Sequence, residues 1–331
     1  VNTTGHNNTA LGYESMKNNT TGNGRNVAVG AGSMYTNTTG YQNTAVGYNS
    51  LRAHTTGYMN TAVGNDSLLS CATGIENAAL GHNALYFNTA SKNTAMGAYA
   101  GNSTTSGGNN TFVGASAGRA NTTATANVAV GTSALLLTTT GTRNTSIGTE
   151  SMYMNTTGSD NVAVGRDALK SNTTGGANIA IGKDANYSNS TASHNLAIGY
   201  RTRVNGTTGS ENVCVGNEAG EDMSTGNQNT LIGMYAGQHI TTNGSNVCIG
   251  YKAGSGQANI SGKLFISRNN TAAGNTSTWI YGDDQGRCYQ GNNSSSWSTS
   301  SDERIKKDIV DSPNGLAKID AVKIRNFNFR T

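Results

Sequence analysis

One pattern of polar, small and aliphatic positions recurs along the first three quarters of the chain. Each copy reads Asn, then Thr or an apolar residue, then a small residue that is usually Ala, then an aliphatic residue or Met, and then Gly. Fifteen copies of this unit, spaced by 17 residues at twelve of the fourteen steps, fill positions 1 to about 255. The copies start at Asn8, Asn26, Asn43, Asn60, Asn77, Asn93, Asn110, Asn127, Asn144, Asn161, Asn178, Asn195, Asn212, Asn229 and Asn246.

The length of the repeat selects the fold. A period of 17 residues is too short for helix-pair solenoids, whose repeats exceed roughly 30 residues, and it matches no coiled-coil period. The alternation after each Asn predicts a short strand, and a shorter strand followed by a Thr-Thr-Gly turn is expected later in each copy. We therefore predict an all-β parallel β-solenoid, or β-roll, in which each repeat forms one coil and the shaft spans residues 1–255.

Gly stands four residues after the Asn in every copy, which predicts a corner with a positive φ angle or a close backbone approach. These corner glycines are Gly12, Gly30, Gly47, Gly64, Gly81, Gly97, Gly114, Gly131, Gly148, Gly165, Gly182, Gly199, Gly216, Gly233 and Gly250.

The two faces of the predicted strand differ in composition. The residue three after the Asn is aliphatic or Met in every copy, and the residue one after it is Thr in seven copies and apolar in eight. We assign both positions to the interior of the coil. The residue between them is Ala in ten copies, and such a column is not typical of a solvent face. We therefore expect the Ala column to face outward and to pack against sister chains.

The thin core of one coil also favours an oligomer. Three or four buried apolar side chains contribute about 1.5–3 kcal/mol each, whereas ordering the backbone costs about 1–2 kcal/mol per residue.

Composition excludes several classes of function. The 331 residues carry a net charge of only +4, which gives no support for a nucleic-acid partner. The longest apolar run, residues 134–137, is far shorter than the roughly 18 residues of a membrane span. No phosphate-binding loop is present. The five His residues share no column of the repeat, so we expect neither a metal site nor a cofactor.

The four Cys residues show no metal-binding or disulfide spacing. Cys214 and Cys248 both occupy the Ala column two coils apart, or about 9.6 Å, which exceeds the about 7 Å that a disulfide spans. We favour buried free thiols, and a bridge between chains near an axis is the alternative.

Two further groups of side chains are candidates for chemistry or binding. The adjacent carboxylates Asp283 and Asp284 favour a turn over a catalytic pair. Tyrosines near the corners and turns of the first half suggest carbohydrate or protein binding, but ordinary turn packing is the favoured interpretation. These are Tyr13, Tyr35, Tyr41, Tyr48, Tyr58, Tyr86 and Tyr99.

The repeat stops near residue 255. Residues 256–301 predict a β transition region with strands at 263–267 and 277–281 and a hairpin turn at 282–286. Residues 302–331 hold seven Lys or Arg and five Asp or Glu, so we expect them to begin a further domain that is truncated here.

Two resemblances connect these segments to known families. The units at residues 161–165 (Asn-Val-Ala-Val-Gly) and 178–182 (Asn-Ile-Ala-Ile-Gly) resemble head repeats of trimeric autotransporter adhesins, which are homotrimeric β-rolls. Residues 301–309 (Ser-Asp-Glu-Arg-Ile-Lys-Lys-Asp-Ile) and 324–329 (Ile-Arg-Asn-Phe-Asn-Phe) are similar to the intramolecular chaperone domain of endosialidase-type phage tail spikes and fibres.

The second resemblance implies assembly and one chemical step. In that family the C-terminal domain trimerises the fibre and then cleaves itself off with a Ser-Lys dyad. By position, Ser301 is the implied nucleophile and Lys306 its base, a role that Lys takes when desolvation lowers its pKa. No enzymatic activity is expected beyond this single autocatalytic cleavage.

The resemblances together predict a homotrimeric tail fibre of a phage or virus that attaches to a glycan or protein receptor on the host, and thus a virion or extracellular location. A bacterial surface adhesin or extracellular filament is the alternative. An ice-binding solenoid is less favoured because the Thr column is interrupted, and no carboxylate pair recurs to support a glycan-cleaving enzyme.

Overall fold

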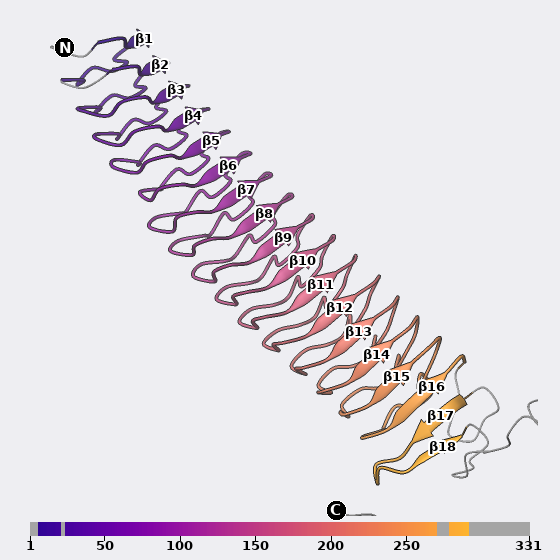
Figure 1. The fold of residues 1–331 in the computed structure, drawn as a ribbon. Helices are drawn as coiled ribbons and strands as arrows, with labels where there is room; N and C mark the ends of the chain where they lie inside the picture. The colour runs from indigo at the N-terminus through magenta and orange to yellow at the C-terminus, as the bar shows by residue number, and fades with distance from the viewer. Residues whose placement is uncertain (1–5, 21–23, 270–277, 291–331) are drawn as a thin grey trace, which may run out of the picture. The chain divides into compact units, whose positions relative to one another are not determined.

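The computed structural model describes residues 6–20, 24–269 and 278–290 and confirms the parallel solenoid. Figure 1 shows one short strand per coil, stacked coil after coil. Within the described residues there are eighteen strands and no helix. The repeat strands are β1 (Thr9–Leu11), β2 (Val27–Val29), β3 (Thr44–Val46), β4 (Thr61–Val63), β5 (Ala78–Leu80), β6 (Thr94–Met96), β7 (Thr111–Val113), β8 (Val128–Val130), β9 (Thr145–Ile147), β10 (Val162–Val164), β11 (Ile179–Ile181), β12 (Leu196–Ile198), β13 (Val213–Val215), β14 (Thr230–Ile232) and β15 (Val247–Ile249).

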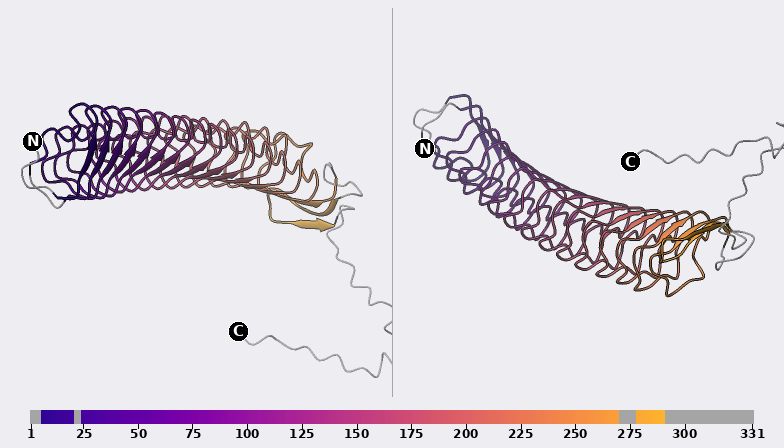
Figure 2. Two further views of the ribbon diagram at one scale, coloured as in Figure 1. Left: turned by 90° about the horizontal axis from the view of Figure 1, so that it is seen from above. Right: turned by 60° about the horizontal axis from the view of Figure 1, so that its bottom comes forward.

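Each repeat strand pairs in parallel with the next, and equivalent residues of the repeat lie side by side. In β10 and β11, for example, Val162 pairs with Ile179 and Ala163 with Ala180. This register turns every position of the repeat into a column that runs along the stack, as the two views of Figure 2 show.

The parallel stack continues one strand beyond the repeats. Strand β16 (Leu264–Ser267) pairs in parallel with β15, and β17 (Thr278–Gly282) and β18 (Cys288–Gln290) add an antiparallel hairpin. The strands and the hairpin expected after residue 255 are therefore present. The segment 302–331, expected to begin a chaperone domain, lies outside the described residues.

The orientation of the repeat strands is the reverse of the prediction. The Ala column faces the interior: Ala163 and Ala180 are fully buried. The aliphatic positions on either side face outward, and Ile179 and Ile181 are each 39% exposed. The reason is the narrow interior, in which the opposite wall of the same coil already contributes a Leu or Met side chain, such as the buried Leu169.

Exceptions in the Ala column show how tightly this interior is filled. Phe112 replaces Ala in the seventh coil and is 1% exposed, and the residues that would otherwise be Leu or Met beside it are Gly101 and Gly118. A Cβ atom built on Gly118 would lie 2.3 Å from the Phe112 ring, and one on Gly101 2.7 Å from it. A large side chain on the strand thus requires glycine on the opposite wall, because the interior has close to crystal packing density.

The corner glycines are confirmed, but the second short strand is absent from the described coils. Gly165 has a φ angle of 134°, and a Cβ there would lie 2.5 Å from the carbonyl oxygen of Gly182. After the corner, the residues six and eight positions after the Asn adopt left-handed backbone, as in Asp167 (φ 60°) and Leu169 (φ 51°). Left-handed Leu is strained, and burial of its side chain offsets that cost.

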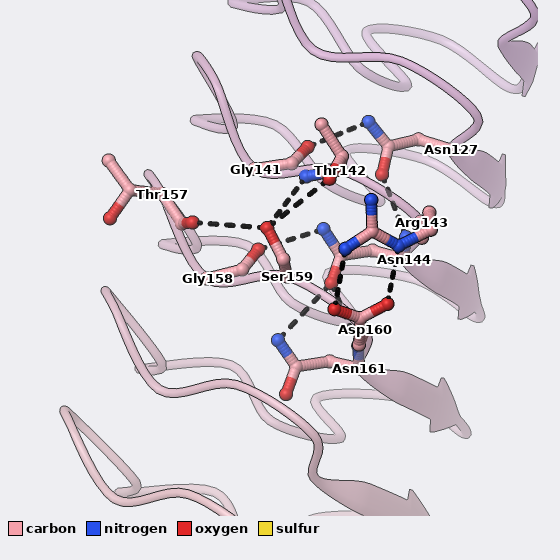
Figure 3. Close-up of polar contacts among 10 residues, drawn as sticks. All are labelled: Asn127, Gly141, Thr142, Arg143, Asn144, Thr157, Gly158, Ser159, Asp160 and Asn161. Carbon is pink, nitrogen blue, oxygen red and sulfur yellow. Dashed lines mark hydrogen bonds and ion pairs between the residues drawn. The ribbon is translucent and has the colours of Figure 1, made fainter.

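The invariant Asn at the start of each strand forms a hydrogen-bonded ladder that the sequence pattern alone did not reveal (Figure 3). The side-chain Oδ1 of Asn144 accepts a bond from the backbone N of Asn161 in the next coil, at 3.0 Å. Its Nδ2 donates to the carbonyl oxygen of Gly158 in its own coil, at 2.9 Å. The same bond from a backbone N to the Asn Oδ1 of the preceding coil recurs from Asn8 to the last repeat. There the donor is the backbone N of Lys263, which stands where the next Asn would be, before β16.

One polar layer interrupts the apolar interior. The buried apolar residues form one cluster from Met16 to Ala185 and a second from Cys214 to Phe265. Between them, the column otherwise occupied by Leu, Met or Gly holds Asn186 and Arg203, both fully buried.

The Arg203 guanidinium in this layer bonds to neutral oxygens. It donates to the side-chain oxygens of Asn186 and Asn189 and to the backbone carbonyl of Gly209. Its Nε has no hydrogen-bond partner among the described residues. Burial lowers the pKa of Arg203 to about 10. A charge held this way is costly, because neutral oxygens replace water incompletely.

Removal of one Asn from the ladder should destabilise the solenoid. Asn144→Ala leaves the buried backbone N of Asn161 without its acceptor and removes one of the two side-chain donors to the carbonyl of Gly158, so we expect a loss of about 2–4 kcal/mol in the free energy of unfolding. Chemical denaturation measures this loss. Asn65→Ala, at an exposed position, is the control and should change stability little; equal effects of the two variants would contradict the role of the ladder.

Restoring the usual residues of the repeat in the polar layer should stabilise the shaft. Other coils carry Leu where Asn186 and Arg203 stand and Asn where Gly206 stands, as in Leu169 and Asn172. We expect the triple variant Asn186→Leu, Arg203→Leu, Gly206→Asn to raise the free energy of unfolding by about 1–4 kcal/mol, because a buried charge is replaced by apolar packing. Denaturant titration is the measurement. A triple variant less stable than the parent would show that the layer is stabilising.

Candidate interaction surface

The outward side of the stacked strands carries a continuous uncharged surface. We define the outer strand face as the residues one and three positions after each Asn, from Thr9 and Leu11 to Val247 and Ile249. Its thirty positions hold only Thr, Ala, Val, Leu, Ile and Met. Many are open to solvent, with Leu80, Met96 and Ile232 among the exposed large apolar residues.

The dimensions of this face follow from the stacking. Fifteen layers at about 4.8 Å give a length of roughly 70 Å, and two outward side chains per strand give a width of roughly 10 Å. The resulting area is on the order of 700 Å², with Thr at seven of the thirty positions, and it is comparable with the largest apolar patches of monomeric soluble proteins, about 300–600 Å², which are often functional. The outer strand face therefore has the size and composition of an interaction surface.

Polar and charged residues border the outer strand face. On one side, at the position before each Asn, Arg143 donates from Nε to Asp160 in the next coil at 2.6 Å (Figure 3). On the other side, directly after the corner glycines, lie Arg166, Lys183 and Tyr200. Exposed ion pairs such as Arg143–Asp160 contribute little to stability. An apolar centre within a polar rim is typical of protein interfaces.

The carboxylates singled out in the sequence form a turn. Asp283 accepts bonds from the backbone N atoms of Gln285 and Arg287, both at 3.0 Å, and from Arg287 Nε at 2.7 Å. Lys263 Nζ donates to Asp284 at 3.0 Å and lowers the pKa of that carboxyl. Both carboxylates are thus engaged in holding the hairpin, in agreement with the expected turn.

The three buried cysteines and the buried histidine belong to the packing of the coils, whereas Cys288 is exposed in β18. Cys214 and Cys248 are free thiols in the interior, where burial raises the pKa of each to about 12. The favoured interpretation is confirmed, and the alternative of a bridge between chains is wrong for these two thiols because they lie inside the coil. His54 is also buried and contacts the carbonyls of Cys71 and Gly57, each at 2.8 Å.

Ser301 and Lys306, the implied autoprocessing dyad, lie outside the described residues. Among the residues that the structure does describe, no group of three His, Cys, Asp or Glu side chains is placed to hold a metal ion, and no helix is long and apolar enough to cross a membrane.

Comparison with known proteins does not assign the chain to a family. No family model matches it, and no curated protein or solved structure is significantly similar to it.

Proposed function

We propose that the chain is the shaft of a homotrimeric attachment fibre, a phage or viral tail fibre. The observation that carries the proposal is the outer strand face, an uncharged surface about 70 Å long that a single chain leaves open to water. Three sister chains that turn these faces toward a common axis would bury them together.

The outer strand face takes the place of the Ala column as the contact between chains. The Ala side chains are used inside each coil, whereas the aliphatic side chains project from it. Each fully buried Val, Leu, Ile or Met contributes about 1.5–3 kcal/mol. With two outward positions in each coil, the gain accumulates along the shaft and supplements the thin core of one chain. Closed cyclic symmetry also prevents further chains from adding to the surface.

The number of chains and the location at a virion rest on the two sequence resemblances. The repeat resembles head repeats that assemble as trimers, and residues 301–309 are similar to a chaperone domain that trimerises phage fibres. A bacterial surface adhesin built from the same repeat would use the same contact between chains.

The mass of the native chain tests the fibre proposal. We expect the protein at micromolar concentration to have three times the chain mass of 34.1 kDa in sedimentation equilibrium. Substitution of Ile147→Asp together with Ile181→Asp, both outward and exposed, should shift the protein to single chains with the strand signal in circular dichroism retained. Thr174→Asp, at an exposed turn outside this face, should leave the trimer intact. A wild-type protein that sediments as a single chain would contradict the proposal.

The proposed chaperone segment adds a single autocatalytic cleavage at Ser301, with Lys306 as the base. When the full-length gene product is expressed, we expect the precursor to be cut at Ser301. Ser301→Ala should leave the precursor intact on a denaturing gel, and Lys307→Ala is the matched control that should be processed. Equal processing of the Ser301→Ala variant and the wild type would exclude the dyad.

A further inference from the structure

A shallow groove of about 330 Å³ lies on the turns of the fourth to sixth coils. Three of its lining residues come from the sixth position after successive Asn residues, and the other three from the ninth and tenth positions. It is lined by Asp66, Asn83, Tyr86, Phe87, Tyr99 and Asn102. These columns lie after the corner glycines and are separate from the outer strand face.

Two aromatic rings give the groove an apolar surface of fixed geometry. Phe87 is 49% exposed, and its ring packs edge-on against Tyr86 with the centroids 4.6 Å apart. Tyr99 is 36% exposed and is held between His82, at 5.2 Å between ring centroids, and the Arg119 guanidinium, at 5.2 Å from the ring centroid. Phe87 therefore offers ring surface to a ligand, and Tyr99 is positioned to offer its edge and hydroxyl.

The polar atoms of the groove have hydrogen-bonding capacity that the described residues do not use. Asp66 accepts a bond from Asn49 at Oδ1, at 3.1 Å, which leaves its Oδ2 available. Asn102 donates from Nδ2 to the carbonyl of Asn83, at 3.2 Å, which leaves its own Oδ1 available. The Asn83 side-chain oxygen is shielded from solvent yet has no hydrogen-bond partner within the part of the chain that the structure describes. A ligand in the groove does not reach this shielded atom, so the acceptors open to a ligand are Asp66 Oδ2 and Asn102 Oδ1.

In two other coils the same columns carry an ion pair. In the first coil Lys17 pairs with Glu14 at 2.6 Å, and in the tenth coil Lys170 pairs with Asp167 at 2.9 Å. In the groove, the ninth positions after the Asn carry Tyr86 and Asn102 in place of Lys. The groove differs from these two coils in carrying aromatic rings and unused acceptors where they carry an ion pair.

We propose that this groove binds an uncharged saccharide. The apolar C–H face of a pyranose ring would lie on Phe87, and its hydroxyl groups would donate to Asp66 Oδ2 and Asn102 Oδ1. A few placed polar groups beside aromatic surface are what a small-ligand site requires, and carboxylate and amide oxygens are acceptors for hydroxyl donors. In the fibre this groove would contact a glycan receptor, a step that rests on the proposed function; the groove itself belongs to one chain.

A peptide fits the groove less well. Peptides commonly add a strand to an open sheet edge, but the backbone N atoms of Asn83 and Phe87 already bond to the carbonyls of Asn65 and Asn102 in adjacent coils. A protein partner would also need a desolvated apolar anchor cluster, whereas Phe87 is the single strongly apolar residue among the six that line the groove.

Binding of the intact chain to a printed array of bacterial and mammalian glycans tests the proposal. We expect the wild type to bind a set of uncharged glycans, and Phe87→Ala and Asp66→Asn each to reduce apparent affinity for that set about tenfold or more. Tyr200→Ala is the control: it removes an exposed ring of the twelfth coil, which contacts Lys183 of the eleventh coil. This variant should bind as the wild type does. Thermal melting should show that all variants remain folded.

Several results would overturn the saccharide site. These are a wild type that binds no glycan on the array, Phe87→Ala and Asp66→Asn variants that bind like the wild type, and binding to arrayed peptides in place of glycans. A trimer that binds no glycan would contradict this site and leave the fibre proposal standing. A single chain that binds glycans through Phe87 would contradict the fibre and leave this site standing.

Discussion

The hydrogen bond from one Asn side chain to the backbone of the next coil is the interaction on which this fold depends. It fixes the start of every strand, and the parallel register then aligns all other columns. The two irregular spacings show that this hydrogen bond is kept even where the length of the repeat changes. The first repeat has 18 residues and the fifth has 16, yet the backbone N atoms of Asn26 and Asn93 still bond to Asn8 and Asn77 at 3.1 and 3.0 Å. The length differences are therefore absorbed outside the ladder, in the turns.

Much of this fold is predictable from the sequence, because the period, the parallel stack and the corner glycines each follow from a column of one residue type. The side on which the strand packs was predicted wrongly, since hydrophobicity alone ranks Val and Ile above Ala for the interior. The volume of the coil decides otherwise. A signal for this was present: Phe112 and Leu231 replace Ala where the opposite column has Gly, at Gly101 and Gly118 and at Gly220 and Gly237. Such compensation places both columns in one interior.

The reversed strand changes which surface is available for function. Inward aliphatic side chains would have been buried within a single chain, whereas outward aliphatic side chains leave an uncharged face along the shaft. The candidate groove was harder to predict, since it depends on Phe87 and Asn102, which no other coil carries at the same positions, and averaging over fifteen copies hides such single differences. The role proposed for Ser301 and Lys306 depends on a sequence resemblance, because their positions are outside the described residues.

A crystal structure of the whole chain, at a resolution that separates the Asn side-chain atoms, tests the central claim most directly. We expect each Asn oxygen to lie within about 3 Å of the backbone N of the next Asn, with the Ala methyl groups inside the coil and the aliphatic side chains outside. Asn side chains directed into solvent, or Ala methyl groups on the outer surface, would contradict it.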